Sequence, residues 1–105
     1  MFQNEFGLLN LSASFNIIHN DIIVASIMTV EQAPWYDTPL GPFIIELMVH
    51  ASHRKQGIGE YLIHHTAGRL AEIGAETVAL RVSSDNPKAL NLYRKCRFVS
   101  YNNVR

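Results

Sequence analysis

The chain has 105 residues, 48% of them hydrophobic, and its nine basic and nine acidic side chains give a formal net charge of zero. This length favours one domain, residues 1–105, with enough apolar side chains for a core. The balanced charge excludes a general electrostatic attraction to nucleic acid or to anionic membranes.

Cysteine content and the N-terminal sequence bear on location. The single cysteine, Cys96, excludes an internal disulfide bond and is typical of a reducing compartment. The first residues lack the basic and then apolar pattern of a signal peptide, and the longest apolar run, FIIELMV, is too short to span a bilayer. We therefore expect a cytoplasmic protein with no membrane partner.

The N-terminal half reads as strands. Two apolar runs separated by Asn20 and Asp21 predict a β-hairpin with strands at 14–19 and 22–30, because Asn and Asp tolerate the left-handed backbone of a tight turn. Prolines at 34, 39 and 42 predict an irregular loop. Residues 43–50 are almost continuously apolar, which predicts a central strand covered on both faces.

The C-terminal half alternates helices and strands. A helix is predicted from the glycine pair at 57 and 59 to Gly74, a strand over 77–82, a second helix capped by Asn86, and a short strand over 98–101. A hairpin followed by strand, helix, strand, helix and strand predicts an α/β fold with a mixed sheet whose middle part is parallel.

The stretch SHRKQGIGEYLIHH, residues 52–65, begins a helix with two poor helix formers. A helix N-terminus presents unpaired backbone N–H groups and the positive end of the macrodipole, and glycines let an anion approach them. Strand, glycine-rich turn and helix is therefore a phosphate-binding arrangement. The alternative is an ordinary tight turn beside a solvated basic pair.

Three phosphate-binding patterns can be compared with this turn. The nucleotide P-loop pattern is absent, and the dinucleotide pattern fails because residue 62 is leucine. The third pattern, [RQ]-x-x-G-x-[GA], is matched at every fixed position by RKQGIG, residues 54–59. It resembles the pyrophosphate-binding turn of the GNAT family, the N-acetyltransferases that use acetyl-coenzyme A.

The context of the turn strengthens the resemblance. Upstream, LMV is followed five residues later by Arg54, as in the fourth strand of the family. Downstream, NPKALNLY with Phe98 resembles the N-x-x-A-x-x-x-Y segment of the family. The resemblance covers residues 15–101 and implies a GNAT-like fold with two splayed parallel strands, 43–50 and 77–82.

The resemblance implies a coenzyme A site between those two strands. Backbone groups of Leu47 and Val49 would pair with the pantetheine arm. Lys88 would either contact the 3′-phosphate or remain a solvated charge, which we favour. The turn would contribute amides that hold the pyrophosphate, from Gln56, Gly57, Ile58, Gly59 and Glu60, and positive charge from Arg54 and Lys55.

Acetyl transfer to an amine needs a base for the amine and an acid for the departing thiolate. Tyr93 aligns with the family tyrosine that serves as the acid; the alternative, that its ring packs in the core, is compatible with that role. Asn86 would cap its helix and contact the cofactor. Glu46 is the candidate base, as a buried carboxylate with a raised pKa. Strand parity places it on the face of Met48 and not on that of Leu47 and Val49, unless a bulge changes the direction in which it faces. A water-relayed proton is the rival.

The sequence departs from the family in two places. Arg97 stands where a glycine usually ends the second helix, and a left-handed residue other than glycine costs roughly 1 kcal/mol. The first strand, the two acceptor-side helices and the last strand of the family have no counterpart. We expect the exposed sheet edges to favour a homodimer, with Trp35 and Tyr36 in a contact or acceptor-side loop.

Five histidines raise the question of a metal site. His64 and His65 are adjacent and diverge by about 100° on a helix, so they cannot both face one ion. No metal-binding spacing is present, and we expect no metal. His50 and His53 flank the glycine-rich turn.

The sequence thus predicts an acetyl-coenzyme A-dependent N-acetyltransferase whose acceptor is a small-molecule or peptide amine. The alternative is a coenzyme A-binding module, regulatory or truncated, without efficient turnover. A plain structural domain would require three motif matches to be coincidental.

Overall fold

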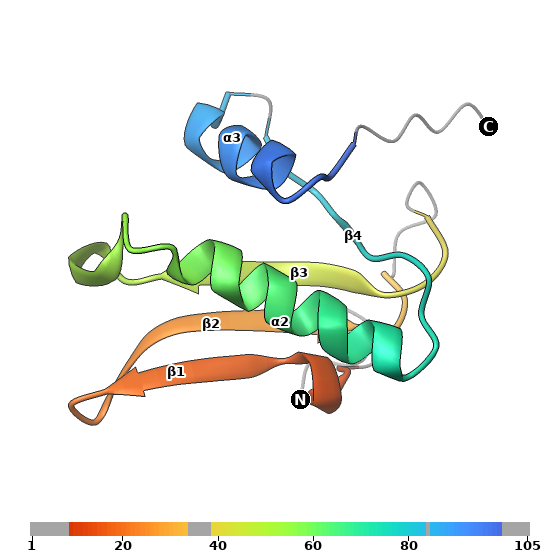
Figure 1. Cartoon of the computed structure of the whole chain (residues 1–105), viewed down its shortest axis with the longest axis horizontal. Helices are drawn as coiled ribbons and strands as arrows, with labels where there is room; N and C mark the ends of the chain where they lie inside the picture. Colours follow the sequence, from red (N-terminus) through yellow and green to blue (C-terminus); the bar gives the residue numbers. More distant parts are fainter. Residues whose placement is uncertain (1–8, 34–38, 84, 100–105) are drawn as a thin grey trace.

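The computed structural model describes residues 9–33, 39–83 and 85–99. Four strands form one sheet in the order β1-β2-β3-β4, α2 lies across one face of it, and α3 lies beside β4 (Figure 1). In chain order the elements are η1 (Leu11–Ala13), β1 (Phe15–His19), β2 (Ile22–Val30), β3 (Phe43–Val49), η2 (Ala51–His53), α2 (Ile58–Glu72), β4 (Ala79–Leu80) and α3 (Pro87–Lys95), η being a 3-10 turn.

The sheet is mixed, as predicted. β2 pairs with β1 and β3 in antiparallel fashion, and β3 pairs with β4 in parallel. The hairpin turn has positive φ angles at Asn20 (53°) and Asp21 (64°), which confirms the left-handed turn. No helix in the described ranges is long and apolar enough to cross a bilayer.

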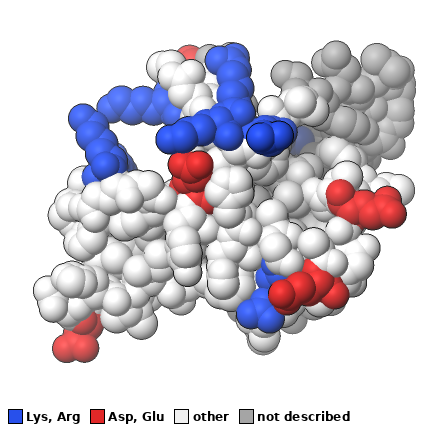
Figure 2. Space-filling model, viewed as in Figure 1, with Lys and Arg blue, Asp and Glu red and all other residues white. Residues whose placement is uncertain are grey.

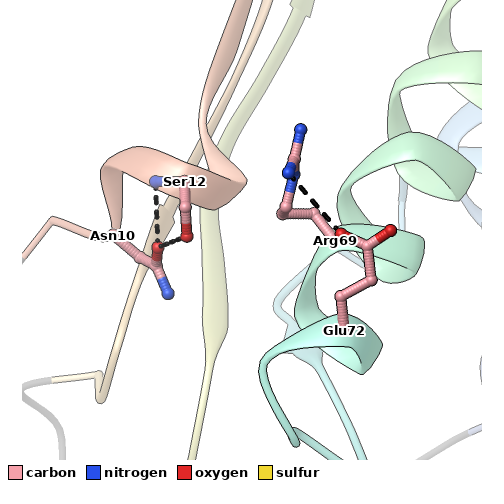
Figure 3. Close-up of polar contacts among 4 residues, drawn as sticks. All are labelled: Asn10, Ser12, Arg69 and Glu72. Carbon is pink, nitrogen blue, oxygen red and sulfur yellow. Dashed lines mark hydrogen bonds and ion pairs between the residues drawn. The ribbon is translucent and has the colours of Figure 1, made fainter.

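The segment before β1 is a capped 3-10 turn. The Oδ1 atom of Asn10 accepts hydrogen bonds from the backbone N–H (3.1 Å) and hydroxyl (2.8 Å) of Ser12 (Figure 3). Thr66 of α2 donates its hydroxyl to the carbonyl of Ala13 at 3.4 Å. This bond fixes η1 against α2, and β1 begins only after η1. Within α2, an Arg69–Glu72 ion pair of 3.5 Å lies on the last turn (Figure 3).

The main core lies between α2 and the sheet. It comprises Ala25, Ile27, Ile44, Leu62 and Ile63. A second cluster comprises Val30, Ala33 and Phe43. It lies on the other face of the sheet, because Val30 and Phe43 have the opposite strand parity to Ile27 and Ile44.

A bulge divides β3 into two parts. Met28 pairs with Glu46 and Thr29 with Ile44, so Ile45 is an extra residue on β3. After the bulge, Leu47 and Val49 pack against the core below α2, whereas Glu46 and Met48 are exposed. The prediction that this strand is covered on both faces is wrong beyond Ile44.

The last part of the chain has less strand than predicted. Only Ala79–Leu80 of the expected 77–82 segment pairs with β3, at Phe43 and Ile44, because β4 then diverges from β3 towards α3 (Figure 1). Phe98 and Val99 are not in a strand, and residues 100–101 of that prediction lie outside the described residues.

Both helices end with left-handed residues, as predicted for Gly74; at Arg97 the structure shows the strained alternative, a left-handed residue other than glycine. Gly74 (φ 94°) follows α2, and Arg97 (φ 73°) follows α3. In each case the left-handed residue donates its N–H to a carbonyl of the last turn, Gly74 to Ala71 at 3.1 Å and Arg97 to Arg94 at 2.9 Å. These bonds are those of a Schellman cap.

Candidate functional site

The two glycines of the turn have different structural roles. Gly57, the N-cap of α2, has φ 80°, and a Cβ there would meet no atom within 4 Å, so it is needed for backbone conformation. Gly59 is helical, but a Cβ on it would lie 3.2 Å from Cδ2 of Leu92 and 4.0 Å from Cγ2 of Val49. Gly59 therefore allows α3 and β3 to approach the first turn of α2.

The start of α2 leaves backbone donors available. Tyr61 is the first residue to donate within the helix, to the carbonyl of Gly57 at 2.9 Å. The N–H groups of Ile58, Gly59 and Glu60 precede it and have no intrahelical acceptor. Gly57 provides no side-chain cap for them. These amides and the helix dipole form a setting for an anion.

Basic side chains lie close to these amides in sequence. Arg54, Lys55 and Gln56 are exposed, and Lys55 has φ 65°. Arg54 donates from Nε to the carbonyl of Val49 at 3.0 Å, which fixes its side chain over the end of β3. On the face in Figure 2, Lys and Arg side chains gather along α3 and at the end of the molecule that carries this turn.

The edge of β3 facing β4 is open beyond the bulge. His50 donates its N–H to Val24 of β2 at 2.7 Å, so the main-chain groups of Val49, and of Leu47 two residues earlier, are directed away from β2. β4 pairs with β3 only as far as Ile44. Leu47 and Val49 thus present strand-edge groups where β3 and β4 diverge, and Arg54 occupies the Val49 carbonyl.

Tyr93 is half-buried on α3 and is held by the helix cap. Phe98 donates its N–H to the Tyr93 carbonyl at 2.9 Å. The two rings meet edge to face with centroids 5.8 Å apart. Burial, and to a lesser extent Cys96, raises the pKa of Tyr93. The hydroxyl therefore remains protonated at neutral pH, as an acid must. Sequence reasoning placed Phe98 in a strand and missed this contact.

Other residues of α3 occupy its first turn. The Oδ1 atom of Asn86 accepts from the N–H of Ala89 at 3.2 Å, which confirms the capping role. Asn86 and Lys88 are exposed. The expected contact of Asn86 with the cofactor, and the alternative contact of Lys88 with the 3′-phosphate, remain predictions.

Glu46 is exposed, on the face opposite α2. The expectation of a buried carboxylate is wrong, and the bulge at Ile45 is the reason. Without that extra residue, Glu46 would share the face of Ile44 and lie below α2.

The histidines beside the turn form a hydrogen-bonded group with Ser52. The hydroxyl of Ser52 lies 2.9 Å from Nδ1 of His50 and 2.7 Å from Nδ1 of His53. The rings of His53 and His19 are 5.5 Å apart. Within the described ranges, no three His, Cys, Asp or Glu side chains gather so as to hold a metal ion. Sequence reasoning missed Ser52 and the approach of His19. Trp35 and Tyr36 lie outside the described residues.

Comparisons with solved structures show the same fold. The chain is similar to PH1933 from Pyrococcus horikoshii OT3, with 26% identity and a TM-score of 0.73 over 89% of this chain and 59% of that one. It is similar to an aminoglycoside acetyltransferase, meta-AAC0020 from an uncultured soil metagenomic sample, with 25% identity and a TM-score of 0.71 over 88% and 60%. It is also similar to the GNAT family protein SP0256 from Streptococcus pneumoniae TIGR4, with 26% identity and a TM-score of 0.63 over 82% and 59%.

The chain thus spans about 60% of the length of these structures. A comparison with curated proteins finds no match. The model of the acetyltransferase (GNAT) family matches residues 3–98. Since this match covers most of the chain and the fold agrees with it, the chain belongs to the GNAT acetyltransferase family.

Proposed function

We propose that the protein is an acetyl-coenzyme A-dependent N-acetyltransferase that acts on an amine. The observation that supports this best is the placement of the uncapped start of α2 next to the open edge of β3. The start of α2 suits a phosphate group, and the open edge of β3 suits an extended chain that contains amides. Coenzyme A contains a pyrophosphate and an amide-containing pantetheine arm, joined to each other.

In this proposal the cofactor follows the surface from α2 to the bulge. The amides from Gln56 to Glu60 bind the pyrophosphate, Arg54 and Lys55 add positive charge, and the strand-edge groups at Leu47 and Val49 bind the pantetheine arm. Arg54 already bonds to Val49 through Nε, so its Nη amines are the part that reaches an anion. Asn86, the N-cap of α3, is proposed to contact the cofactor as well.

Bound acetyl-coenzyme A supplies an activated thioester, whose acetyl group passes to the amine nitrogen while the carbon–sulfur bond breaks. Tyr93 donates its proton to the departing sulfur. Glu46 accepts the proton of the amine, through water, since its carboxylate is exposed. The aromatic contact with Phe98 orients the Tyr93 ring for its role.

The acceptor is proposed to be a small-molecule or peptide amine. One similar structure is an aminoglycoside acetyltransferase, and aminoglycosides carry amines. A coenzyme A-binding module without efficient turnover is the alternative. We also propose a homodimer, because β1 lies at an edge of the sheet.

A matched pair of variants at Gly57 tests the cofactor site. Both Asn and Asp tolerate a left-handed backbone, and a side chain there meets open space. Acetyl-coenzyme A should raise the melting temperature of the wild type and of Gly57→Asn by mass action. Gly57→Asp should lose the shift, because it adds a negative charge beside the pyrophosphate. An equal shift in both variants would contradict the assignment. Transfer to a panel of amines then separates the enzyme from the binding module.

A further inference from the structure

The first turn of α2 is one of the places where α3 packs on the rest of the protein. None of the residues of α3 is fully buried, and β4, which leads towards it, pairs over only two residues. Leu92 of α3 fits against the bare backbone of Gly59. Leu92 and Tyr93 of α3, and Cys96 at its end, also pack against the main core.

An ion pair joins the same two helices. Nζ of Lys95 lies 3.3 Å from Oε1 of Glu60, and Nε2 of His64 lies 3.7 Å from Oε2 of the same carboxylate. Glu60 is in the first turn of α2, where the helix dipole stabilises a negative charge. Burial, and then the charge of Glu60, raises the pKa of the Cys96 thiol, while the charge of Lys95 lowers it.

Tyr93 is carried by the helix that this ion pair fixes. Leu92, Lys95 and Cys96 are three and four residues apart and share one face of α3, the face that meets α2. Tyr93, on the same helix, packs against the main core and is also held by the Phe98 cap. A shift of α3 relative to α2 would thus move the Tyr93 hydroxyl relative to the cofactor turn.

We infer that Glu60 and Lys95 are positioning residues, whose ion pair fixes α3 so that Tyr93 meets the reacting sulfur. This inference rests on the proposed function of Tyr93. The pair is exposed, with 31% of the Glu60 side chain and 69% of the Lys95 side chain accessible. Exposed pairs contribute little to folding, so its loss should lower turnover by about two- to fivefold rather than abolish it.

The kinetic experiment compares three variants. Lys95→Met should lower kcat by about two- to fivefold and leave KM for acetyl-coenzyme A unchanged. Lys95→Arg keeps the charge and should restore kcat. Arg94→Met removes the neighbouring exposed charge and should leave kcat unchanged. Equal losses in Lys95→Met and Arg94→Met would overturn the inference, since net charge would then be the cause.

A double-mutant cycle tests whether Lys95 acts through Tyr93. In the Tyr93→Phe background, Lys95→Met should cause no further loss of kcat. A full additional loss would overturn the inference, because Lys95 would then act on another group.

A spectroscopic readout separates this inference from the proposed function. With 3-fluorotyrosine at all four tyrosines, the Tyr93 signal in ¹⁹F NMR is identified by its absence in Tyr93→Phe. Lys95→Met should shift that signal and Arg94→Met should not. A shift in a protein without any transferase activity would support the positioning role and contradict the proposed function. An unchanged signal in Lys95→Met would overturn the positioning role whatever the activity.

Discussion

Phe98 binds Tyr93 twice, through a 2.9 Å hydrogen bond from its N–H to the Tyr93 carbonyl and through an edge-to-face ring contact of 5.8 Å. These are the main-chain bond and the hydrophobic contact of a Schellman cap. Arg97, between them in the cap, has the left-handed conformation that glycine adopts most easily, with φ 73°. The cap that ends α3 therefore also orients the side chain proposed as the acid.

Replacement of Arg97 by glycine should stabilise the protein. Arg97→Gly removes the strain of a left-handed side chain and should raise the free energy of unfolding by up to about 1 kcal/mol. Arg97→Val should lower it, because a β-branched residue tolerates this conformation worst. Urea denaturation measures both. A loss of stability in Arg97→Gly would show that the side chain itself contributes contacts.

Gly59 and Gly68 form a matched pair within α2. Gly68→Ala adds a Cβ that meets no atom within 4 Å, so it should stabilise the helix by about 1 kcal/mol. Gly59→Ala places a Cβ 3.2 Å from Leu92, so crowding should cancel that gain or reverse it. In a Leu92→Ala background, alanine at 59 should again stabilise the helix. Thermal unfolding of Gly68→Ala, Gly59→Ala, Leu92→Ala and the double variant Gly59→Ala/Leu92→Ala measures these effects. Equal effects at 59 and 68 would contradict the packing role of Gly59.

Tyr93→Phe separates the chemical role of Tyr93 from its packing. The variant keeps the ring that contacts Phe98 and removes only the hydroxyl, so melting temperature and acetyl-coenzyme A binding should be nearly normal. Turnover should fall by about 10²–10⁴, the usual effect of removing a general acid. Steady-state kinetics measures turnover, and calorimetric titration measures acetyl-coenzyme A binding. Full activity would leave the ring with a structural role alone.

Alkaline pH should destabilise the fold through Cys96 and Tyr93. Burial raises both pKa values, from ordinary values of 9.0 and 10.0. The folded state therefore holds these protons more tightly than the unfolded state, and this part of the stability is complete below pH 9. It should be lost as pH rises through the folded pKa values. The free energy of unfolding measured between pH 8 and about 11 should fall less steeply in Cys96→Ala/Tyr93→Phe; equal slopes would contradict this.

Self-association should follow from the sheet edge. β1 lies at one end of the strand order, and Ile18 on it has 65% of its surface exposed. Edge strands of this kind favour pairing with another chain. Light scattering at micromolar concentration should give a dimer, and Ile18→Lys should shift it towards the monomer. A wild-type monomer across that range would contradict the proposed assembly.

The sequence by itself determined the parts of this protein that depend on residues close together in the chain. Asn20 and Asp21 specify the hairpin turn, Asn86 caps α3, and Gly74 and Arg97 end the helices, because each acts on backbone groups within a few residues. The glycine-rich turn and its following helix could be located for the same reason, and they led to the family.

Only the tertiary structure decided the features that depend on distant residues. The extra residue at Ile45, set by pairing with β2, turns Glu46 outward, and no local pattern encodes a register shift. The reason for Gly59 lies 33 residues away at Leu92. The partner of Glu60 lies on another helix, at Lys95. These contacts form only when the chain packs, because each joins two distant segments and the local sequence of neither segment specifies their relative position.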